Sequence, residues 1–480
     1  MKYKHALFLN PYIETGTTTT MSLFPPTGLE YVATSAKDYA GKLTLLDLRC
    51  EKELCDPGKL MDYIRKEQID IICVTIAWNR QFEQICSLLN SMPDNIPIVV
   101  GGYKATESVG EIFKNCPKVN IMVRGEGEET IREIMKDMPL ENILGISYRK
   151  DNKIIHNKIR PLPDINTITP PDRTLRRYDY RIISNGITVT NAAFDTILSS
   201  RGCPFNCRFC TFSLNPLGQK RNYISRGAES VIKEIEEMSA DIILFSDDNL
   251  FVETKRAEEI CDLIIARGIK KRFVAQARID LAQHPELLKK MVKAGFKMLL
   301  LGIESPHDHI LAELNKGFNQ EIIRKCFAEF RKYPIFYHGN YIYGNIGETE
   351  EEMLYISEFS KEIGVDSVAF SKLRIDQYSP LKEIVEKTQG YHITDRGEIY
   401  SDTYSHARLK KIHRKLKFSF YTPLRLLKML KKVVKVKFFT VGEILSCVVI
   451  MPALLKSIVA REMQKKRLGD SIKHIFMHNA

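Results

Sequence analysis

The sequence lacks the features that secreted, membrane-spanning and nucleic-acid-binding proteins need. Its 11 cysteines are mostly scattered over 480 residues, unlike a secreted disulfide framework. The uncharged tail run ILSCVVIMPALL is too short to span a bilayer, and the start MKYKHALFLNP turns polar too soon for a signal peptide. The single tryptophan offers no base-stacking platform, and no RNA-binding motif occurs. We therefore expect a cytoplasmic protein that binds no nucleic acid.

The positive charge of the chain is concentrated in its tail. The net charge is +12, and residues 401–480 carry 18 Lys and Arg against 4 Asp and Glu, while the other 400 residues carry 53 against 55. Cations alternate with Phe, Leu, Val and Ile in this tail. One interpretation is a set of helices packed on the body with a solvated lysine face. The other is a basic amphipathic helix in peripheral contact with an anionic membrane surface.

Apolar runs and helical patterns alternate five times over residues 1–150. ALFLNP, LTLLDL, IDIICVTIA, IPIVVGG and VNIMV have the character of strands, and each is followed by a segment with helical spacing. This order predicts an α/β fold with a doubly wound, Rossmann-like parallel sheet. Ligands of such sheets bind at the carboxyl ends of the strands. Gly101 and Gly102 stand at one such end, where they permit close approach of a ligand or form a plain turn.

A second series of strands and helices follows a proline-rich segment. RPLPDINTITPPDR has four prolines and no periodic run, so residues 151–190 are predicted to be a linker. Strand and helix then alternate about six times over residues 191–385. This predicts a partial (β/α)6 TIM-like barrel, with its chemistry at the carboxyl ends of the strands. Residues 386–480 are predicted to form a basic, mostly helical C-terminal region.

Three cysteines of the stretch SSRGCPFNCRFCTF stand close together, directly after a predicted strand. Cys203, Cys207 and Cys210 form one compact loop, without the second cysteine pair that a structural zinc site needs. An iron–sulfur cubane with one open iron fits this spacing better, and a non-catalytic iron–sulfur or zinc protein is the alternative of another class. The phenylalanines available to shield such a group are Phe205, Phe209 and Phe212.

The Cys-x3-Cys-x2-Cys spacing resembles the signature of the radical S-adenosylmethionine (SAM) enzymes. In that family three cysteines hold a 4Fe–4S cluster, and its open iron chelates the amino and carboxylate groups of SAM. An electron from the cluster cleaves SAM to a 5′-deoxyadenosyl radical, which abstracts a hydrogen atom. The resemblance explains the absent fourth cysteine, because SAM supplies that ligand. It also implies that Cys203, Cys207 and Cys210 are the cluster ligands of a radical SAM barrel.

The same resemblance implies cofactor-binding residues at the later strand ends. FSDDNLF stands where the family places its contact to the SAM amino group, although the familiar Gly-Gly-Glu is absent. AQARID and LGIES follow, and GNYIYGNIGETEEE resembles the glycine-rich stretch beside the adenine. The residues implied in this way are Asp247, Asp248, Arg278, Glu304, Ser305, Gly344 and Gly347. Helix capping is the alternative role for the carboxylates, and no catalytic residue is assigned.

The order of domains resembles the cobalamin-binding subclass of this family. PPTGLEYVATSA, IVVGGYKAT and VRGEGEET are similar to stretches common in that subclass, which makes residues 1–150 the cobalamin-binding domain. The loop NPYIETGTTTT contains no histidine, so we expect cobalamin to bind without a protein imidazole on cobalt. Trp78 and Asn79 are candidates for its lower face, and a packing role for the tryptophan is the alternative.

Cobalamin together with a SAM radical implies methyl transfer to an unactivated carbon. Members of the same subclass also perform cyclisation, oxidation or rearrangement, and the sequence does not separate these outcomes. The expected partners are a small-molecule, lipid or peptide substrate and an external electron donor such as flavodoxin or ferredoxin. If the tail contacts a membrane, a lipid substrate is expected, because the order of domains resembles that of the hopanoid methylases and the bacteriochlorophyll ring cyclase.

Overall fold

The chain forms two compact units, which we describe one at a time. The first comprises Met1–Pro163, Ile168–Asp195 and Thr440–Ala480, and the second comprises Asp164–Thr167 and Thr196–Phe439. The computed structural model describes residues 2–13, 21–22, 24–77, 81–184, 187–210, 214–375, 378–394, 397–454, 456–457 and 460. Within these ranges we find no helix with the length and apolarity that a bilayer crossing requires.

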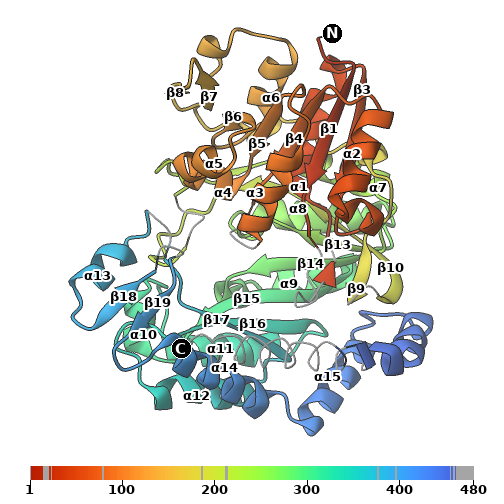
Figure 1. Ribbon diagram of the computed structural model, residues 1–480. Coiled ribbons are helices and arrows are strands. Elements are labelled where there is room, and N and C mark those ends of the chain that lie inside the picture. Colours follow the sequence, from red (N-terminus) through yellow and green to blue (C-terminus); the bar gives the residue numbers. More distant parts are fainter. Residues whose placement is uncertain are drawn as a thin grey trace. The chain divides into compact units, whose positions relative to one another are not determined.

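The first unit is built on a seven-stranded sheet with the order β3-β1-β4-β5-β6-β7-β8 (Figure 1). The pairs among β3, β1, β4, β5 and β6 are parallel, whereas β7 and β8 are antiparallel to their neighbours. The strands are β1 (His5–Asn10), β3 (Lys42–Asp47), β4 (Ile71–Thr75), β5 (Ile98–Gly101), β6 (Val119–Val123), β7 (Ile146–Lys150) and β8 (Lys153–His156).

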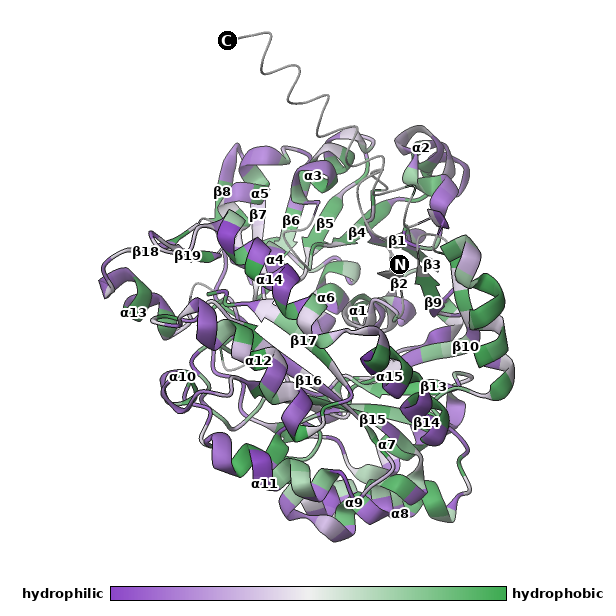
Figure 2. Ribbon diagram, turned by 90° about the horizontal axis from the view of Figure 1, so that it is seen from below, coloured by the Kyte–Doolittle hydropathy of each residue, from purple (hydrophilic) through white to green (hydrophobic). Residues whose placement is uncertain are grey.

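Helices cover both faces of this sheet, so its inner strands are largely apolar (Figure 2). One core cluster contains Leu7 and Leu9 of β1, and a separate cluster contains Ala6 and Phe8. The helices are α1 (Thr27–Ala36), α2 (Pro57–Lys66), α3 (Phe82–Ser91), α4 (Tyr103–Glu107), α5 (Val109–Asn115) and α6 (Glu128–Met135). The prediction of a doubly wound parallel sheet is confirmed.

The hairpin of β7 and β8 extends the sheet beyond residue 150, and the predicted linker begins inside it. Its turn is formed by Asp151 and Asn152, which both have positive φ, at 49° and 59°. The predicted basic C-terminal region is also divided, because Thr440–Ala480 groups with the first unit. The domain boundaries given above therefore stay predictions.

The second unit contains a curved sheet of parallel strands, as predicted for a partial barrel. Its order is β17-β16-β15-β14-β13, and the end of β10 joins beside β13, where the Ser246 amide donates to the Ile197 carbonyl at 2.8 Å. The strands are β10 (Ile187–Ile197), β13 (Ile242–Phe245), β14 (Arg272–Ala277), β15 (Phe296–Glu304), β16 (Phe336–Tyr343) and β17 (Ser367–Lys372). Helices alternate with these strands, and the partial-barrel prediction is confirmed.

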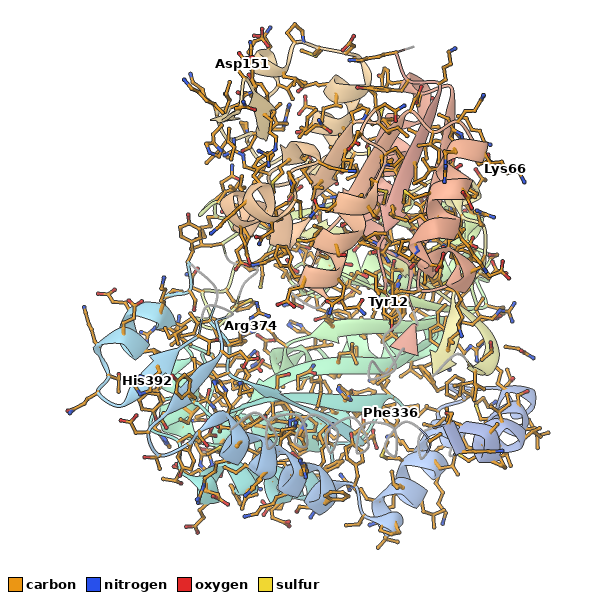
Figure 3. All side chains as sticks on the ribbon, viewed as in Figure 1. Tyr12, Lys66, Asp151, Phe336, Arg374 and His392 are labelled. Carbon is orange, nitrogen blue, oxygen red and sulfur yellow. The ribbon has the colours of Figure 1, made fainter. Side chains whose placement is uncertain are left out.

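The site lies at the end of this sheet where the strands finish. Figure 3 labels Phe336, which begins β16, and Arg374, which follows β17 at the opposite end. The helices of this unit are α7 (Ala228–Glu237), α8 (Thr254–Ala266), α9 (Pro285–Ala294), α10 (Asp308–Glu313), α11 (Gln320–Phe330), α12 (Glu350–Ile363), α13 (Leu381–Lys387), α14 (His406–Phe420) and α15 (Pro423–Lys435). Short antiparallel pairs are β11 (Ser200–Arg201) with β12 (Ile224–Ser225), β18 (Tyr391–Ile393) with β19 (Ile399–Ser401), and, in the first unit, β2 (Met21–Ser22) with β9 (Arg181–Ser184).

Candidate functional site

The three-cysteine loop begins at a glycine that no other residue could replace without strain. Gly202 has φ of +79°, and a Cβ there would lie 2.6 Å from the Asn222 carbonyl oxygen. The chain therefore turns sharply out of β11 and enters the cysteine segment. Cys207 is buried, whereas Cys203 and Cys210 are half-buried, and none of the three forms a disulfide.

The loop is held by segments that are remote in sequence. The Arg208 amide donates to the Leu314 carbonyl at 3.0 Å, and the Asn315 side chain donates to the Asn206 carbonyl at 2.8 Å. The Ser379 hydroxyl donates to the Arg208 carbonyl at 2.8 Å. These contacts fix the backbone on both sides of Cys207.

Asp247 and Asp248 brace the segment that leads into the loop. Asp247 is fully buried and accepts hydrogen bonds from the Ser199 hydroxyl at 2.7 Å and from the Ser200 hydroxyl. Burial raises its pKa above the ordinary aspartate value. Asp248 is half-buried, and its carboxylate accepts the Gly202 amide at 3.0 Å. Of the two, only Asp248 has surface that a ligand could contact.

Arg278 is the predicted site residue that the structure places directly against the cysteine loop. Its guanidinium carbon lies 3.7 Å from the centre of the Phe205 ring, and its Nη1 lies 3.8 Å from Cys207 Sγ. Its Nη2 donates to the Lys316 carbonyl at 2.9 Å. A fixed guanidinium at this position places a positive charge directly against the cysteine loop.

Glu304 forms a buried ion pair with Lys316, a residue that the sequence did not single out. Lys316 Nζ lies 2.8 Å from Glu304 Oε1 and 5.5 Å from the centre of the Phe209 ring. Glu304 has φ of 69°, a conformation that costs a non-glycine residue roughly 1–3 kcal/mol. Ser305 is fully buried, and its hydroxyl accepts the His307 amide at 3.1 Å. Glu304 and Ser305 therefore shape the end of β15, and Lys316 joins it to the loop.

The glycine-rich segment after β16 contains a buried carboxyl group. Gly344 lies at the end of the strand, and Glu348 accepts hydrogen bonds from the Asn345 amide at 2.9 Å and from its side chain at 3.1 Å. Glu348 Oε1 and Asn345 Oδ1 are buried and have no hydrogen-bond partner within the described ranges. Burial raises the pKa of Glu348 from its ordinary value of 4.5 to about 7.

This carboxyl group makes stability depend on pH. Because the pKa is higher in the folded chain, the folded state binds more protons between about pH 4.5 and pH 7, and the free energy of unfolding falls as the pH rises through that window. We expect Glu348→Gln to flatten that decline and to be more stable than wild type at about pH 8, by up to about 3 kcal/mol. Urea unfolding followed across this pH range tests the prediction. The control is Glu351→Gln on exposed α12 surface, and an unchanged pH slope in the Glu348 variant would contradict it.

In the first unit, Gly101 and Gly102 lie at the carboxyl end of β5 and are half-buried. Gly102 has φ of +108°, and a Cβ there would lie 2.7 Å from the Ile76 carbonyl oxygen. Only glycine therefore lets the ends of β4 and β5 approach each other while their backbone stays accessible. Trp78 and Asn79, like Phe212 of the cysteine loop, lie outside the described residues.

The cysteine loop has the chemistry that an iron–sulfur cluster requires, although its thiols are not gathered around one point. Among the described side chains, no group of three or more His, Cys, Asp or Glu converges as metal ligands. The fit rests instead on three thiols in one loop, on the Arg278 and Lys316 cations, and on the Phe205 and Phe209 rings. Burial raises the pKa of Cys203, and a bound cation reverses this effect by deprotonating the thiol.

Comparison with known proteins supports two cofactor domains. The family model of the radical SAM superfamily matches residues 197–360, and the model of the B12-binding domain matches residues 15–135. An uncharacterized methyltransferase of Pyrococcus horikoshii is 28% identical over 72% of this chain and 75% of its own length. The anaerobic magnesium-protoporphyrin IX monomethyl ester cyclase of Cereibacter sphaeroides is 25% identical over 72% of this chain and 58% of its own length.

A solved structure has the same fold. The radical SAM methyltransferase TsrM from Kitasatospora setae, with cobalamin and a 4Fe–4S cluster bound, superposes with a TM-score of 0.69. It is 16% identical, and the match covers 88% of this chain and 90% of that one. The partial barrel, with three thiols beside two cations, agrees with the radical SAM model. The doubly wound sheet that precedes it in the sequence agrees with the B12-binding model. Residues 197–360 therefore form a radical SAM domain and residues 15–135 a B12-binding domain, and the cofactors of this chain are a 4Fe–4S cluster, SAM and cobalamin.

Proposed function

We propose that this enzyme methylates an unactivated carbon of its substrate. The observation that carries the proposal is the three-thiol loop beside Arg278 in a chain that also has a B12-binding domain. The names of the Pyrococcus horikoshii relative and of TsrM, both methyltransferases, support it. When bound, the cluster and SAM supply a 5′-deoxyadenosyl radical, and cobalamin supplies the methyl group.

The residues proposed to hold these groups lie at the ends of β5, β11, β13, β14 and β16. Cys203, Cys207 and Cys210 would bind the cluster, and Arg278 and Asp248, which are half-buried beside the loop, would contact the charged groups of SAM. Gly101 and Gly102 would present backbone to cobalamin. Asp247, Glu304 and Ser305 are buried, so we assign them the role of positioning the loop and the end of β15. Gly344 stays the candidate next to the adenine.

The second candidate function is non-methyl radical chemistry, such as ring closure. The cyclase of Cereibacter sphaeroides, which is 25% identical, favours this candidate. We propose a small-molecule, lipid or peptide substrate, and flavodoxin or ferredoxin as the class of electron donor. The geometry favours none of these substrates over the others.

The two candidates differ in what they release from SAM. Methyl transfer consumes SAM both as a radical source and as a methyl donor, so it releases 5′-deoxyadenosine and S-adenosylhomocysteine. Ring closure releases 5′-deoxyadenosine without S-adenosylhomocysteine. The full chain, reconstituted with iron, sulfide and cobalamin without oxygen, is to be incubated with SAM and a reductant, and both products measured by mass spectrometry.

A glycine variant adds a control within the chain. We expect Gly102→Ala to lose bound cobalamin and S-adenosylhomocysteine formation by at least about 10-fold, because the added Cβ clashes with the Ile76 carbonyl. It should keep 5′-deoxyadenosine formation. Gly110→Ala, where no atom lies within 4 Å of the added Cβ, should retain both products. Absence of S-adenosylhomocysteine from wild type would refute methyl transfer.

A further inference from the structure

The two helices of the basic tail in the second unit pack in opposite ways. In α14, Leu409, Ile412, Leu416 and Phe420 are buried, and the Ser357 hydroxyl of α12 donates to the Leu416 carbonyl at 2.9 Å. The lysines of α14 face solvent, as the first interpretation of the tail predicts. The next helix, α15, contains no buried residue at all.

The apolar side of α15 faces solvent. Leu426, Leu427, Leu430 and Val434 are 49%, 48%, 52% and 49% exposed. Since each residue turns a helix by about 100°, these four positions lie within one stripe. In Figure 2 the ribbon of this helix has both green, hydrophobic and purple, hydrophilic segments. A packed surface helix normally buries such a stripe, so its exposure needs a binding partner.

Two cations of α15 contact the body of its own unit. Arg425 donates to the Val365 carbonyl and lies 4.8 Å from the centre of the Phe420 ring. Lys432 Nζ lies 3.8 Å from Asp366 Oδ2 and 5.6 Å from the centre of the Tyr337 ring. These contacts orient the helix so that its apolar stripe stays outside.

A second exposed stripe of α15 is cationic. Lys428, Lys431 and Lys435 follow one another at helical spacing and are exposed. The helix contains no Asp or Glu to neutralise them. The surface therefore combines an apolar stripe with three positive charges.

Helical residues 441–454, which belong to the first unit, also expose apolar side chains. Val441, Leu445, Val448 and Val449 are 74%, 59%, 61% and 78% exposed, with the spacing of one helix face. Eleven of the eighteen exposed large apolar side chains within the described ranges lie between Phe418 and Met451. The exposed apolar surface is therefore concentrated in the tail.

We propose that α15 docks the enzyme on the surface of an anionic lipid bilayer. Exposed apolar stripes beside lysines match acyl chains and anionic headgroups at once. A second copy of this chain fits less well, because a symmetric contact through α15 would place Lys428, Lys431 and Lys435 against their own copies. The inference is independent of the reaction, since it concerns where the enzyme binds and not what it transfers.

Sedimentation of the full chain with vesicles tests this proposal without any turnover. We expect binding to vesicles of phosphatidylglycerol and phosphatidylcholine at low salt, weakening at high salt, and little binding to phosphatidylcholine alone. Replacing Lys428, Lys431 and Lys435 by glutamine should weaken binding by about 100-fold. Replacing Leu426, Leu430 and Val434 by serine should weaken it by at least about 100-fold.

Matched substitutions elsewhere in the second unit separate docking from general loss of apolarity or charge. Ile265→Ser with Ile322→Ser removes exposed apolar side chains, and Lys255, Lys270 and Lys293 changed to glutamine remove exposed charges. Both sets should bind like wild type, and circular dichroism confirms that each variant is folded. Wild type that stays in the supernatant with anionic vesicles would overturn the proposal. So would tail variants that lose self-association or a protein partner but bind vesicles unchanged.

Discussion

Cys207→Ala is expected to remove the bound iron and to lower 5′-deoxyadenosine formation by more than about 100-fold. This exceeds the roughly 10- to 100-fold effect of replacing a residue that only contacts a metal ligand. Cys207 is the buried member of the three, and its thiol faces Arg278. Without its thiolate the loop offers two ligands, too few for a cluster whose fourth position SAM must fill. Iron and sulfide content, the visible absorption and product formation measure the effect.

A cysteine outside the loop provides the control. Cys261 is buried in α8, and burial raises the pKa of its thiol to about 12, so it is neutral at physiological pH. Cys261→Ala should keep its iron and its activity and lose only about 1 kcal/mol of stability. Full iron loading of the Cys207 variant would show that the cluster is bound elsewhere.

Lys316→Met is expected to lower the free energy of unfolding by about 3–5 kcal/mol, because it leaves the buried Glu304 carboxylate without its counter-charge. The pair is almost fully enclosed, with the two charged atoms 2.8 Å apart. Glu304 cannot turn to solvent easily, since it sits at the end of β15 in a left-handed backbone conformation. Urea unfolding of the variant measures the loss.

Two further variants test whether the loss of stability comes from the unpaired buried charge. Glu304→Gln combined with Lys316→Met should recover most of the stability, because no uncompensated charge remains. Lys325→Met breaks a pair with Glu321 in which both side chains are exposed, and should change stability by less than about 1 kcal/mol. Equal effects of the Lys316 and Lys325 changes would show that burial adds nothing to the first pair.

The cysteine loop and the sheets could be predicted from the sequence because their signals are local. Cysteine spacing is visible within a dozen residues, and each parallel strand is a short apolar run followed by a helical pattern. Arg278 was predicted as a cofactor-binding residue at a strand end, without its contacts in the loop. Its contacts with Phe205 and Cys207 depend on how β14 and the loop meet, which no local pattern describes.

No sequence pattern singles out Lys316, because its contact with Glu304 depends on the chain turning back after α10. After β15 the chain passes through α10 and returns, which places Lys316 against Glu304, 12 residues earlier. The β7–β8 hairpin did have a signal. Asp151-Asn152 lies between two runs of strand character, and such pairs favour the positive φ values of a two-residue hairpin turn. The prolines that follow led us to predict a linker instead.

The orientation of α15 could not be predicted either. Its spacing separates an apolar stripe from a cationic one, but periodicity does not say which stripe faces the protein. The choice depends on Asp366 and the Val365 carbonyl, which attract Lys432 and Arg425. Contacts with partners distant in the sequence, here more than 50 residues away, decide such cases.

The anchors of the cysteine loop determine when the cluster site is completed during protein synthesis. Asn315 contacts Asn206 across 109 residues of sequence, and Ser379 contacts Arg208 across 171. Both partners leave the ribosome long after the three cysteines, at a pace of about 5–20 residues per second. The thiols must therefore wait for several seconds, reduced and unligated, before the nascent chain can hold them in place. Cluster insertion is thus expected only after both anchoring residues have been synthesised. The nascent chain is most vulnerable to oxidants before that point.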